Sequence, residues 1–398
     1  MKIVYLAAYF YPEKYASDGI YTSVLEELAK SNEVHVITPQ PTRGVSDEEF
    51  LGYCAHEVKN GVNIHRFPME REKRSALKRM LRYKKCERKY KKMAKAIGGA
   101  DYVFAASTPP TMGILASKIA KKTGAKFIYS LQDIFPDSLI SGGILKKKGG
   151  PIWWLGRQIE KKTYKAADCI TVISNSFYKN LRGKNVPADK LAFIPNWVDL
   201  NNVHPVEKEK NGLFEEFGIA RDKFNVVYAG NMGAAQGAEI ILDVAERLKG
   251  EGHIQFVVFG GGAGYEDFAY AVKDRKLHNV IVNPLLSQER VSEVYSLGDA
   301  ALIICKKGVG QTGLPSKTWS IMACNTPIVA SFDTDSELAE ILRDVNAGVC
   351  IKAGDADALS GAILEKAKSP MKVSTRQYLQ ENLSKEVLLE KYLELFNI

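Results

Sequence analysis

Short apolar segments alternate with amphipathic segments along almost the whole chain, and this alternation limits the possible folds more than any other feature. In the first half, the segments expected to be strands lie at 2–8, 33–39, 101–107, 126–133 and 169–174. Segments with helical periodicity lie between them, at 19–31, 111–124 and 152–168. Strand–helix alternation of this kind predicts parallel sheets with helices on both faces.

The same rhythm restarts after a polar, turn-rich stretch around 194–212. The strands expected in the second half lie at 224–230, 254–260, 279–284, 300–305, 327–331 and 348–353. A chain of 398 residues is long enough for two domains. We therefore predict an α/β protein with two doubly wound, Rossmann-like domains, over 1–198 and 199–384, that face a cleft. A C-terminal helix over 385–398 is expected to pack back on the first domain.

The composition is that of an ordinary globular protein, with 45% hydrophobic and 25% charged residues. The six cysteines are scattered without a C-x-x-C pair, so we expect neither a disulfide framework nor a zinc site. The histidines also lack the spacing of metal ligands. No apolar stretch approaches the roughly 20 residues of a membrane span. These features predict a cytoplasmic protein that is not integral to a membrane and has no metal site.

The positive charge of the chain is concentrated in one segment. Residues 70–96 hold thirteen Lys or Arg and three Glu, which gives +10, whereas the whole chain carries +9. Apolar residues recur there at steps of three or four, which predicts an amphipathic helix with a strongly basic outer face. Such a face is an ordinary solvated surface, an anchor for anionic lipid headgroups, or a surface for nucleic acid.

A second segment favours the membrane among these alternatives. The lysines at 146–148 precede Trp153 and Trp154, and tryptophans beside lysines are typical of a membrane interface. The alternative is that the two tryptophans pack in the core. We expect peripheral binding to the inner face of the cell membrane, without nucleic acid, through Arg79, Arg82, Lys85, Lys89, Lys92, Trp153 and Trp154.

Three loops in the second half have the composition of anion-binding loops. Residues 228–237 and 259–267 follow strands and carry glycines ahead of expected helices, and 313–317 leads into a third helix. Glycine loops at helix N-termini bind phosphate through their backbone N–H groups. Lys317 stands in a first helical turn, where a cation is disfavoured, so we expect an anion beside it. The sequence thus predicts a phosphate-bearing ligand with Lys317 as its counter-ion.

Motifs of both halves occur together in one known family. In the first half they are LQDIFPDSL, AADCITVIS and IPNWVD, which begin at 131, 166 and 194. In the second half they include VVYAGNMGAAQG, VVFGGGAGYEDF and PSKTWSIMACNTPIVAS, which begin at 226, 257 and 315. With these motifs the chain resembles the retaining GT-B glycosyltransferases of family 4, also called group 1. It is most similar to the fucosamine-type amino-sugar transferases of bacterial capsule and O-antigen synthesis.

The resemblance implies transfer of an N-acetylamino sugar from a UDP-sugar to a polyprenyl-phosphate-linked acceptor, with retention and without a metal or other cofactor. It implies Asp133 and Lys317 as catalytic residues. The donor-binding residues it implies are Gly230, Asn231, Gly233, Gly260, Gly261, Gly262, Pro315, Ser316, Lys317 and Ser320. On the side of the acceptor and the sugar it implies Asp18, Gly19, Gln132 and Asp133.

The chain departs from the family pattern at several of these positions. Many members carry two glutamates eight residues apart where Thr312 and Ser320 stand here. The arginine and lysine of the first donor loop correspond to Asn231 and Gln236. Lys317 and the amides of that loop are therefore expected to stabilise the charge that develops on the diphosphate.

Some interpretations stay open at this point. Asp133 orients the acceptor hydroxyl or the sugar, or it only begins a turn; Asp137 is read as a helix cap. The Asp-Thr-Asp segment at 333–335 is better explained as a helix start than as a metal motif. A nucleotide-sugar epimerase on the same fold, and a catalytically degenerate nucleotide-binding partner or scaffold, are the competing functions.

Overall fold

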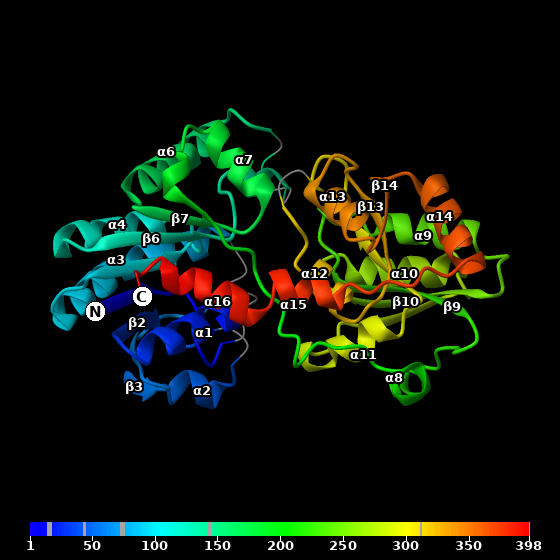
Figure 1. The fold of residues 1–398 in the computed structure, drawn as a ribbon, viewed down its shortest axis with the longest axis horizontal. Helices are drawn as coiled ribbons and strands as arrows, with labels where there is room; N and C mark the ends of the chain where they lie inside the picture. The colour runs from blue at the N-terminus through cyan, green and yellow to red at the C-terminus, as the bar shows by residue number, and fades with distance from the viewer. Residues whose placement is uncertain are drawn as a thin grey trace. The chain divides into compact units, whose positions relative to one another are not determined.

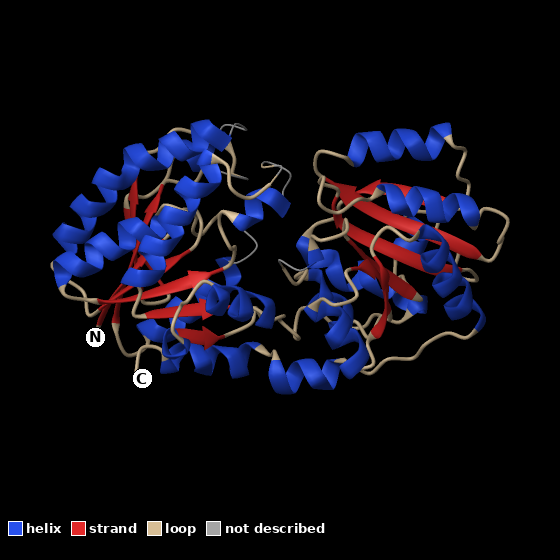
Figure 2. Cartoon of the chain, turned by 90° about the horizontal axis from the view of Figure 1, so that it is seen from above, coloured by secondary structure: helices blue, strands red, loops and turns tan. Residues whose placement is uncertain are grey.

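The computed structural model describes residues 1–13, 18–42, 45–71, 76–141, 145, 147–310 and 313–397. The chain forms two compact units (Figure 1). The first unit contains Met1–Ser138, Lys147–Asn196 and Leu388–Ile398, and the second contains Leu139–Lys146 and Trp197–Val387. Each unit has its own largely parallel sheet, with helices on both sides of the strands (Figure 2). The predicted α/β class with two parallel sheets is confirmed.

The sheet of the first unit has eight strands in the order β3-β4-β2-β1-β5-β6-β7-β8. They are β1 (Lys2–Leu6), β2 (Glu33–Pro39), β3 (His56–Lys59), β4 (Val62–Phe67), β5 (Tyr102–Ala106), β6 (Lys126–Leu131), β7 (Cys169–Val172) and β8 (Leu191–Phe193). All neighbours are parallel except β3 and β4, which form an antiparallel edge. The central strands β1 and β5 are buried because helices cover both faces.

The helices of the first unit surround this sheet. They are α1 (Asp18–Ala29), α2 (Asp47–Leu51), α3 (Ala76–Ile97), α4 (Met112–Thr123), α5 (Asp137–Ser141), α6 (Pro151–Ala166) and α7 (Asn175–Gly183). The end of α16 (Lys385–Glu394) also belongs here. Phe396, just beyond it, is fully buried and packs against the rings of Tyr102 and Phe104. The last residues of the chain therefore complete the core of the first unit.

The sheet of the second unit has six parallel strands in the order β11-β10-β9-β12-β13-β14. They are β9 (Phe224–Asn231), β10 (Ile254–Gly261), β11 (Val280–Pro284), β12 (Ala300–Ile304), β13 (Ile328–Phe332) and β14 (Gly348–Lys352). The helices are α8 (Leu213–Glu216), α9 (Glu239–Arg247), α10 (Tyr265–Asp274), α11 (Val291–Ser296), α12 (Lys317–Ala323), α13 (Glu337–Asp344), α14 (Ala356–Lys368) and α15 (Arg376–Asn382). Short 3-10 turns occur at Ala188–Lys190, Lys208–Lys210 and Gln288–Arg290.

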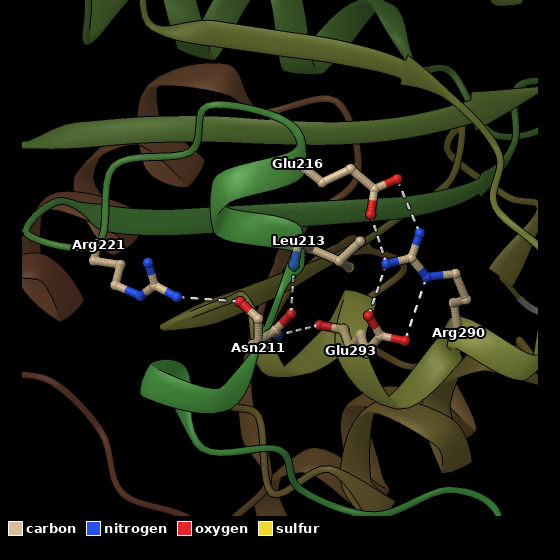
Figure 3. A network of polar contacts seen from close by, with 6 residues as sticks. All are labelled: Asn211, Leu213, Glu216, Arg221, Arg290 and Glu293. Carbon is tan, nitrogen blue, oxygen red and sulfur yellow. Dashed lines mark hydrogen bonds and ion pairs between the residues drawn. The ribbon is translucent and has the colours of Figure 1, made fainter.

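A polar network ties the start of the second unit to its sheet-covering helices (Figure 3). Arg290 makes two hydrogen bonds to the carboxylate of Glu216, of 3.0 and 2.8 Å, and two to that of Glu293, of 3.3 and 2.8 Å. The side-chain amide of Asn211 donates to the backbone oxygen of Glu293 at 2.7 Å. Bidentate arginine pairs fix geometry as well as charge, so this network anchors α8 beside α11.

Candidate functional site

The strand order of the second unit reverses direction between β9 and β12, and the loops after these two strands lead to opposite sides of the sheet. From β9 the chain continues outward to β10 and β11, and it then returns to the other side of β9 to form β12, β13 and β14. Ligands of open parallel sheets bind outside the carboxyl ends of the strands at such a switch point. The loops at this point are residues 232–237, here called the β9 loop, and residues 305–310, here called the β12 loop.

Lys317 begins α12 and places its ammonium at the carboxyl end of β9. Its Nζ donates a hydrogen bond of 2.8 Å to the backbone oxygen of Ala229 and lies 4.3 Å from the ring centroid of Tyr228. Among the described residues, Lys317 forms no ion pair with a carboxylate. Desolvation by the surrounding protein lowers its pKa to about 8. An anion at this position would restore the charge that burial disfavours.

The backbone conformation at position 230 favours glycine, and the ammonium of Lys317 lies directly beside it. Gly230 has a φ of 150°, and a Cβ there would lie 2.5 Å from the Nζ of Lys317. Gly262 is similarly restricted, because its φ is 89° and a Cβ would collide with the side chain of Asn231. Both φ values lie in the region that favours glycine, so a side chain at either position would strain the backbone and displace the neighbouring side chain.

The two glycine-rich loops lie side by side. Gly230 is paired with Gly260, and Asn231 with Gly261, in the register of β9 and β10. The backbone N–H of Met232 donates to Gly261 at 2.7 Å. The structure thus brings together the Gly230 and Gly260 loops and Lys317, although they are far apart in the sequence.

The other residues expected on the donor side follow the same elements. Ser316 precedes α12 with an exposed side chain and makes no capping bond, and Pro315 before it is half-buried. Ser320 lies one turn after Lys317 on α12, so the two share a face of the helix. Gly233 lies between the side chains of Asn231 and Gln236 in the β9 loop. Thr312 lies outside the described residues.

In the first unit, the loops after β5, β6 and β8 bring Asp133 and Gln132 together with two further residues. The backbone N–H groups of Gln132 and Asp133 both point to the Oγ of Ser107, at 3.0 and 3.2 Å. The side-chain amides of Gln132 and Asn196 make two hydrogen bonds, of 3.2 and 2.8 Å. Ser107 and Asn196 were not among the predicted site residues, although both follow strands, which was the available signal.

Asp133 follows β6 and is an exposed residue, but the protein around its carboxyl group replaces part of its hydration. This partial desolvation raises the pKa of Asp133 above its ordinary value. Asp18 and Gly19, also predicted for this side, begin α1. A Cβ at Gly19 would meet nothing within 4 Å. The side chain of Asp18 lies outside the described residues.

A buried ion cluster holds the segment that follows Asp133. Burial acts to raise the pKa of Asp137, but the hydrogen bond and charge of Lys184, with the charge of Lys148 and the hydrogen bond of Trp153, together lower it. The Nζ of Lys184 lies 2.9 Å from Asp137 and 2.6 Å from Glu160. The indole N–H of Trp153 donates to Asp137 at 3.3 Å. The segment after Asp133 is therefore fixed to both α6 and α7.

The prediction that Arg82 contacts the membrane is wrong, because its side chain is buried. Arg82 is only 8% exposed, and its guanidinium donates to the Oγ1 of Thr42 at 2.9 Å. It lies on the buried stripe of α3 with Cys86 and Tyr90, at steps of four residues, so it cannot contribute to the basic outer face. Lys85 and Lys92 are exposed, as is Lys89, whose Nζ donates to the Pro68 carbonyl at 2.6 Å. The side chain of Arg79 is outside the described residues.

The two tryptophans of α6 have different surroundings. Trp153 is half-buried and hydrogen-bonded, whereas Trp154 is 56% exposed. Ile152 and Leu155 are 63% and 64% exposed. These two residues and Trp154 are exposed apolar side chains in the first turns of α6, here called the α6 patch. In the part of the chain that the structure describes, no helix combines the length and the apolar character of a membrane span.

The Asp-Thr-Asp segment has a different role from the expected helix start. Ser336 caps α13, because its Oγ accepts a hydrogen bond from the backbone N–H of Ala339. Asp333 is instead nearly buried at the end of β13, where its two oxygens accept hydrogen bonds from Gly308 and Gly310. Its carboxylate therefore holds the β12 loop.

Comparison with known proteins agrees with this architecture. Residues 21–202 match the family described as Glycosyltransferase Family 4, and residues 209–386 match Glycosyl transferases group 1. The chain is 27% identical over 412 residues to the Escherichia coli K12 protein named "Putative colanic acid biosynthesis glycosyl transferase WcaI", and the match covers 99% of each chain. It is 27% identical over 296 residues to "Probable glycosyltransferase WbjE" of Pseudomonas aeruginosa, with 73% of each chain covered.

Solved structures share the fold. Sucrose-phosphate synthase of Thermosynechococcus elongatus has a TM-score of 0.75 at 14% identity, covering 100% of this chain and 98% of its own. Anabaena Alr3699/HepE in complex with UDP has a TM-score of 0.74 at 13% identity, covering 100% of both chains. At such identities the likeness establishes the fold alone. With the family matches over both halves, it identifies the chain as a glycosyltransferase of family 4 (group 1) with the GT-B fold.

Proposed function

We propose that this glycosyltransferase moves a sugar, an N-acetylamino sugar by its nearest resemblance, from a UDP-sugar to a polyprenyl-phosphate-linked saccharide. The reaction retains the anomeric configuration, needs no metal, and serves the synthesis of a bacterial capsule, O-antigen or exopolysaccharide. The observation that carries the proposal is the desolvated ammonium of Lys317 beside the Gly230 loop. The relative named for colanic acid biosynthesis and the neighbour in complex with UDP support it.

The chemistry follows from where charge develops. Breaking the bond between the sugar and the phosphate leaves negative charge on the diphosphate, and preorganised cations and N–H groups stabilise that charge. Lys317 and the backbone amides of the β9 loop are suited to this task. Asp133, whose pKa is raised by desolvation, would orient the acceptor hydroxyl or the transferred sugar from the first unit.

We place the acceptor at the inner face of the cell membrane. The α6 patch exposes a tryptophan, an isoleucine and a leucine, and Lys147 and Lys148 just before α6 are exposed. Exposed Lys85 and Lys92 add positive charge on α3. Apolar side chains beside lysines bind the interface of an anionic bilayer.

The test is a calorimetric titration of UDP and GDP, without metal, into the wild type, Lys317→Ala and the control Lys372→Ala, which changes an exposed lysine. We expect UDP to bind the wild type and the control alike, and Lys317→Ala about tenfold more weakly, the size of one charge-assisted hydrogen bond. Screening of UDP-sugars with polyprenyl-phosphate-linked acceptors, and NMR of the product anomer, then test transfer and retention.

Two other results would change the conclusion. If UDP binds but no pair of donor and acceptor is turned over, the loss of the two family glutamates, at Thr312 and Ser320, has abolished catalysis. The chain is then a nucleotide-binding partner of an assembly. If neither nucleotide binds the wild type, the proposed function is wrong.

A further inference from the structure

The β12 loop brings a lysine to the end of the β9 loop. The backbone N–H of Lys306 donates to the carbonyl oxygen of Ala235 at 2.9 Å. A Cβ built on Gly237, whose φ is 62°, would lie 2.9 Å from the Cγ of Lys306 and 3.4 Å from its Cε. The aliphatic part of the Lys306 side chain therefore lies directly over the backbone of Gly237.

The β9 loop has no cation of its own. Its residues 232–237 read MGAAQG and contain neither lysine nor arginine. Lys317 contacts the backbone just before this loop, at Ala229, and Lys306 contacts its end, at Ala235 and Gly237. Two lysines from outside the loop thus border it at its two ends.

The backbone that carries Lys306 is held in place. The Oδ1 of Asp333 accepts a 2.9 Å hydrogen bond from the backbone N–H of Gly308, and its Oδ2 accepts one of 2.9 Å from Gly310. The backbone N–H of Cys305 also donates to Ser331 at 3.0 Å. Asp333 itself is only 9% exposed, so the clamp is well shielded from water.

The ammonium of Lys306, in contrast, is only loosely held. Its Nζ lies 3.7 Å from the carboxylate of Glu239, and the two side chains are 53% and 69% exposed. Exposed pairs of this kind contribute little, about 0–1 kcal/mol. The ammonium is therefore free to turn to a ligand phosphate.

We infer that Lys306 is a second diphosphate-binding cation of the donor site, presented by a loop that Asp333 holds in position. The inference rests on the proposed function and deepens it. The β9 and β12 loops diverge at the switch point of the sheet, where a bound phosphate is expected. A donor diphosphate there would be approached by Lys317 from the start of the β9 loop and by Lys306 from its end. Asp333 is a positioning residue in this arrangement.

The experiment measures UDP affinity by calorimetry for the wild type, Lys306→Met, Lys306→Arg and the matched control Lys307→Met, which removes the adjacent exposed lysine. We expect Lys306→Met to bind UDP about five- to tenfold more weakly. Lys307→Met should match the wild type, and Lys306→Arg should keep most of the affinity. Affinity for uridine, measured by saturation-transfer NMR, should not change in Lys306→Met, because uridine has no phosphate.

Asp333→Asn tests the positioning role. Alone, it should weaken UDP binding in the same direction as Lys306→Met but by less. In the double variant Lys306→Met/Asp333→Asn the affinity should equal that of Lys306→Met, because residues that act through one another are not additive. A thermal unfolding curve shows whether Asp333→Asn remains folded.

Several results would overturn the inference. An unchanged UDP affinity in Lys306→Met, an equal loss in Lys307→Met, or an equal loss for uridine would each exclude a specific contact with the diphosphate. If the losses of UDP affinity in the two single variants multiply in the double variant, Asp333 does not act through Lys306. If the wild type binds UDP and Lys306→Met does so equally, only this inference is wrong; if the wild type binds no UDP, the proposed function is wrong with it.

Discussion

The two units have the same architecture, but the carboxyl ends of their sheets carry opposite chemistry. In the second unit a lysine, Lys317, is desolvated without a carboxylate partner among the described residues, and its pKa is lowered to about 8. In the first unit an aspartate, Asp133, is desolvated without a cationic partner among the described residues, and its pKa is raised. Under the proposed function, the second unit would supply the cation for the leaving diphosphate, and the first unit would supply a carboxyl group for the acceptor or the sugar.

The largest effect on activity should come from replacing Lys317 or Asp133 by a neutral residue. Lys317→Ala should lower kcat by about 100-fold or more, the usual size of losing a donor to developing negative charge. Asp133→Asn should lower kcat by about 10- to 100-fold and leave UDP affinity unchanged, because it lies in the other unit. Steady-state kinetics and UDP titration measure both. Loss of UDP affinity in Asp133→Asn would contradict the prediction that UDP binds only through residues of the second unit.

The pH dependence of UDP binding should be the next largest effect. Because burial lowers the pKa of Lys317 from its ordinary 10.5 to about 8, the free protein loses this charge above pH 8. UDP affinity should therefore fall about threefold between pH 8 and 9 and approach the roughly tenfold loss expected for Lys317→Ala at higher pH, since the neutral lysine no longer pairs with the anion. Lys317→Arg stays charged and should give a flat profile. A wild-type profile as flat as that of Lys317→Arg would contradict the role of this proton.

Gly230→Ala should displace the lysine without removing it. Its Cβ would lie 2.5 Å from the Nζ of Lys317, at a φ of 150°, so we expect about 1–3 kcal/mol less stability to unfolding. UDP affinity should also fall severalfold. Gly252→Ala is the control, because a Cβ there meets nothing within 4 Å. Denaturant unfolding and calorimetry measure the two effects, and equal behaviour of both variants would show that Lys317 is not constrained by Gly230.

The smallest effect concerns a surface that distinguishes the first unit. Trp154→Ala should reduce binding to vesicles of anionic phospholipid about threefold, because it removes part of the apolar α6 patch. Tyr270→Ala is matched to it, since Tyr270 is a 71% exposed aromatic residue on α10 of the second unit. Vesicle sedimentation measures both variants. Equal retention by the vesicles would show that the α6 patch does not contact lipid.

The fold class could be predicted because its signals are local. Strands such as β10 and β12 are continuous apolar runs, and helices of period 3.6 separate them. The short edge strand β3 was not predicted, because its His-Glu-Val-Lys sequence has a weak apolar pattern. Its structure depends on pairing with β4, which is tertiary information.

The errors on the predicted membrane surface have a common physical cause. Arg82 was predicted to lie on the basic outer face of α3, yet its guanidinium is bound to Thr42 inside the unit. Adjacent residues on a helix point about 100° apart, so Trp153 and Trp154 cannot both face the same surroundings. Periodicity shows which face is apolar, but it does not show which polar group finds a buried partner.

The donor side was predicted only in part for a similar reason. The glycine loops and Lys317 form recognisable motifs, and the structure places them together; their binding of phosphate stays a prediction. Lys306 has no motif around it. Only the neighbouring order of β9 and β12 brings it to the β9 loop, and that order cannot be read from the sequence near Lys306.

The burial of Tyr392 and Phe396 in the first unit has a consequence for synthesis on the ribosome. The strands of this unit emerge first, but its core lacks two fully buried aromatic side chains until the residues after Leu388 have been made. Domains generally fold in the order of their synthesis. Here all residues of the second unit, which ends at Val387, are made before Tyr392 and Phe396, so the unit whose strands are translated earlier is the unit whose core is completed last.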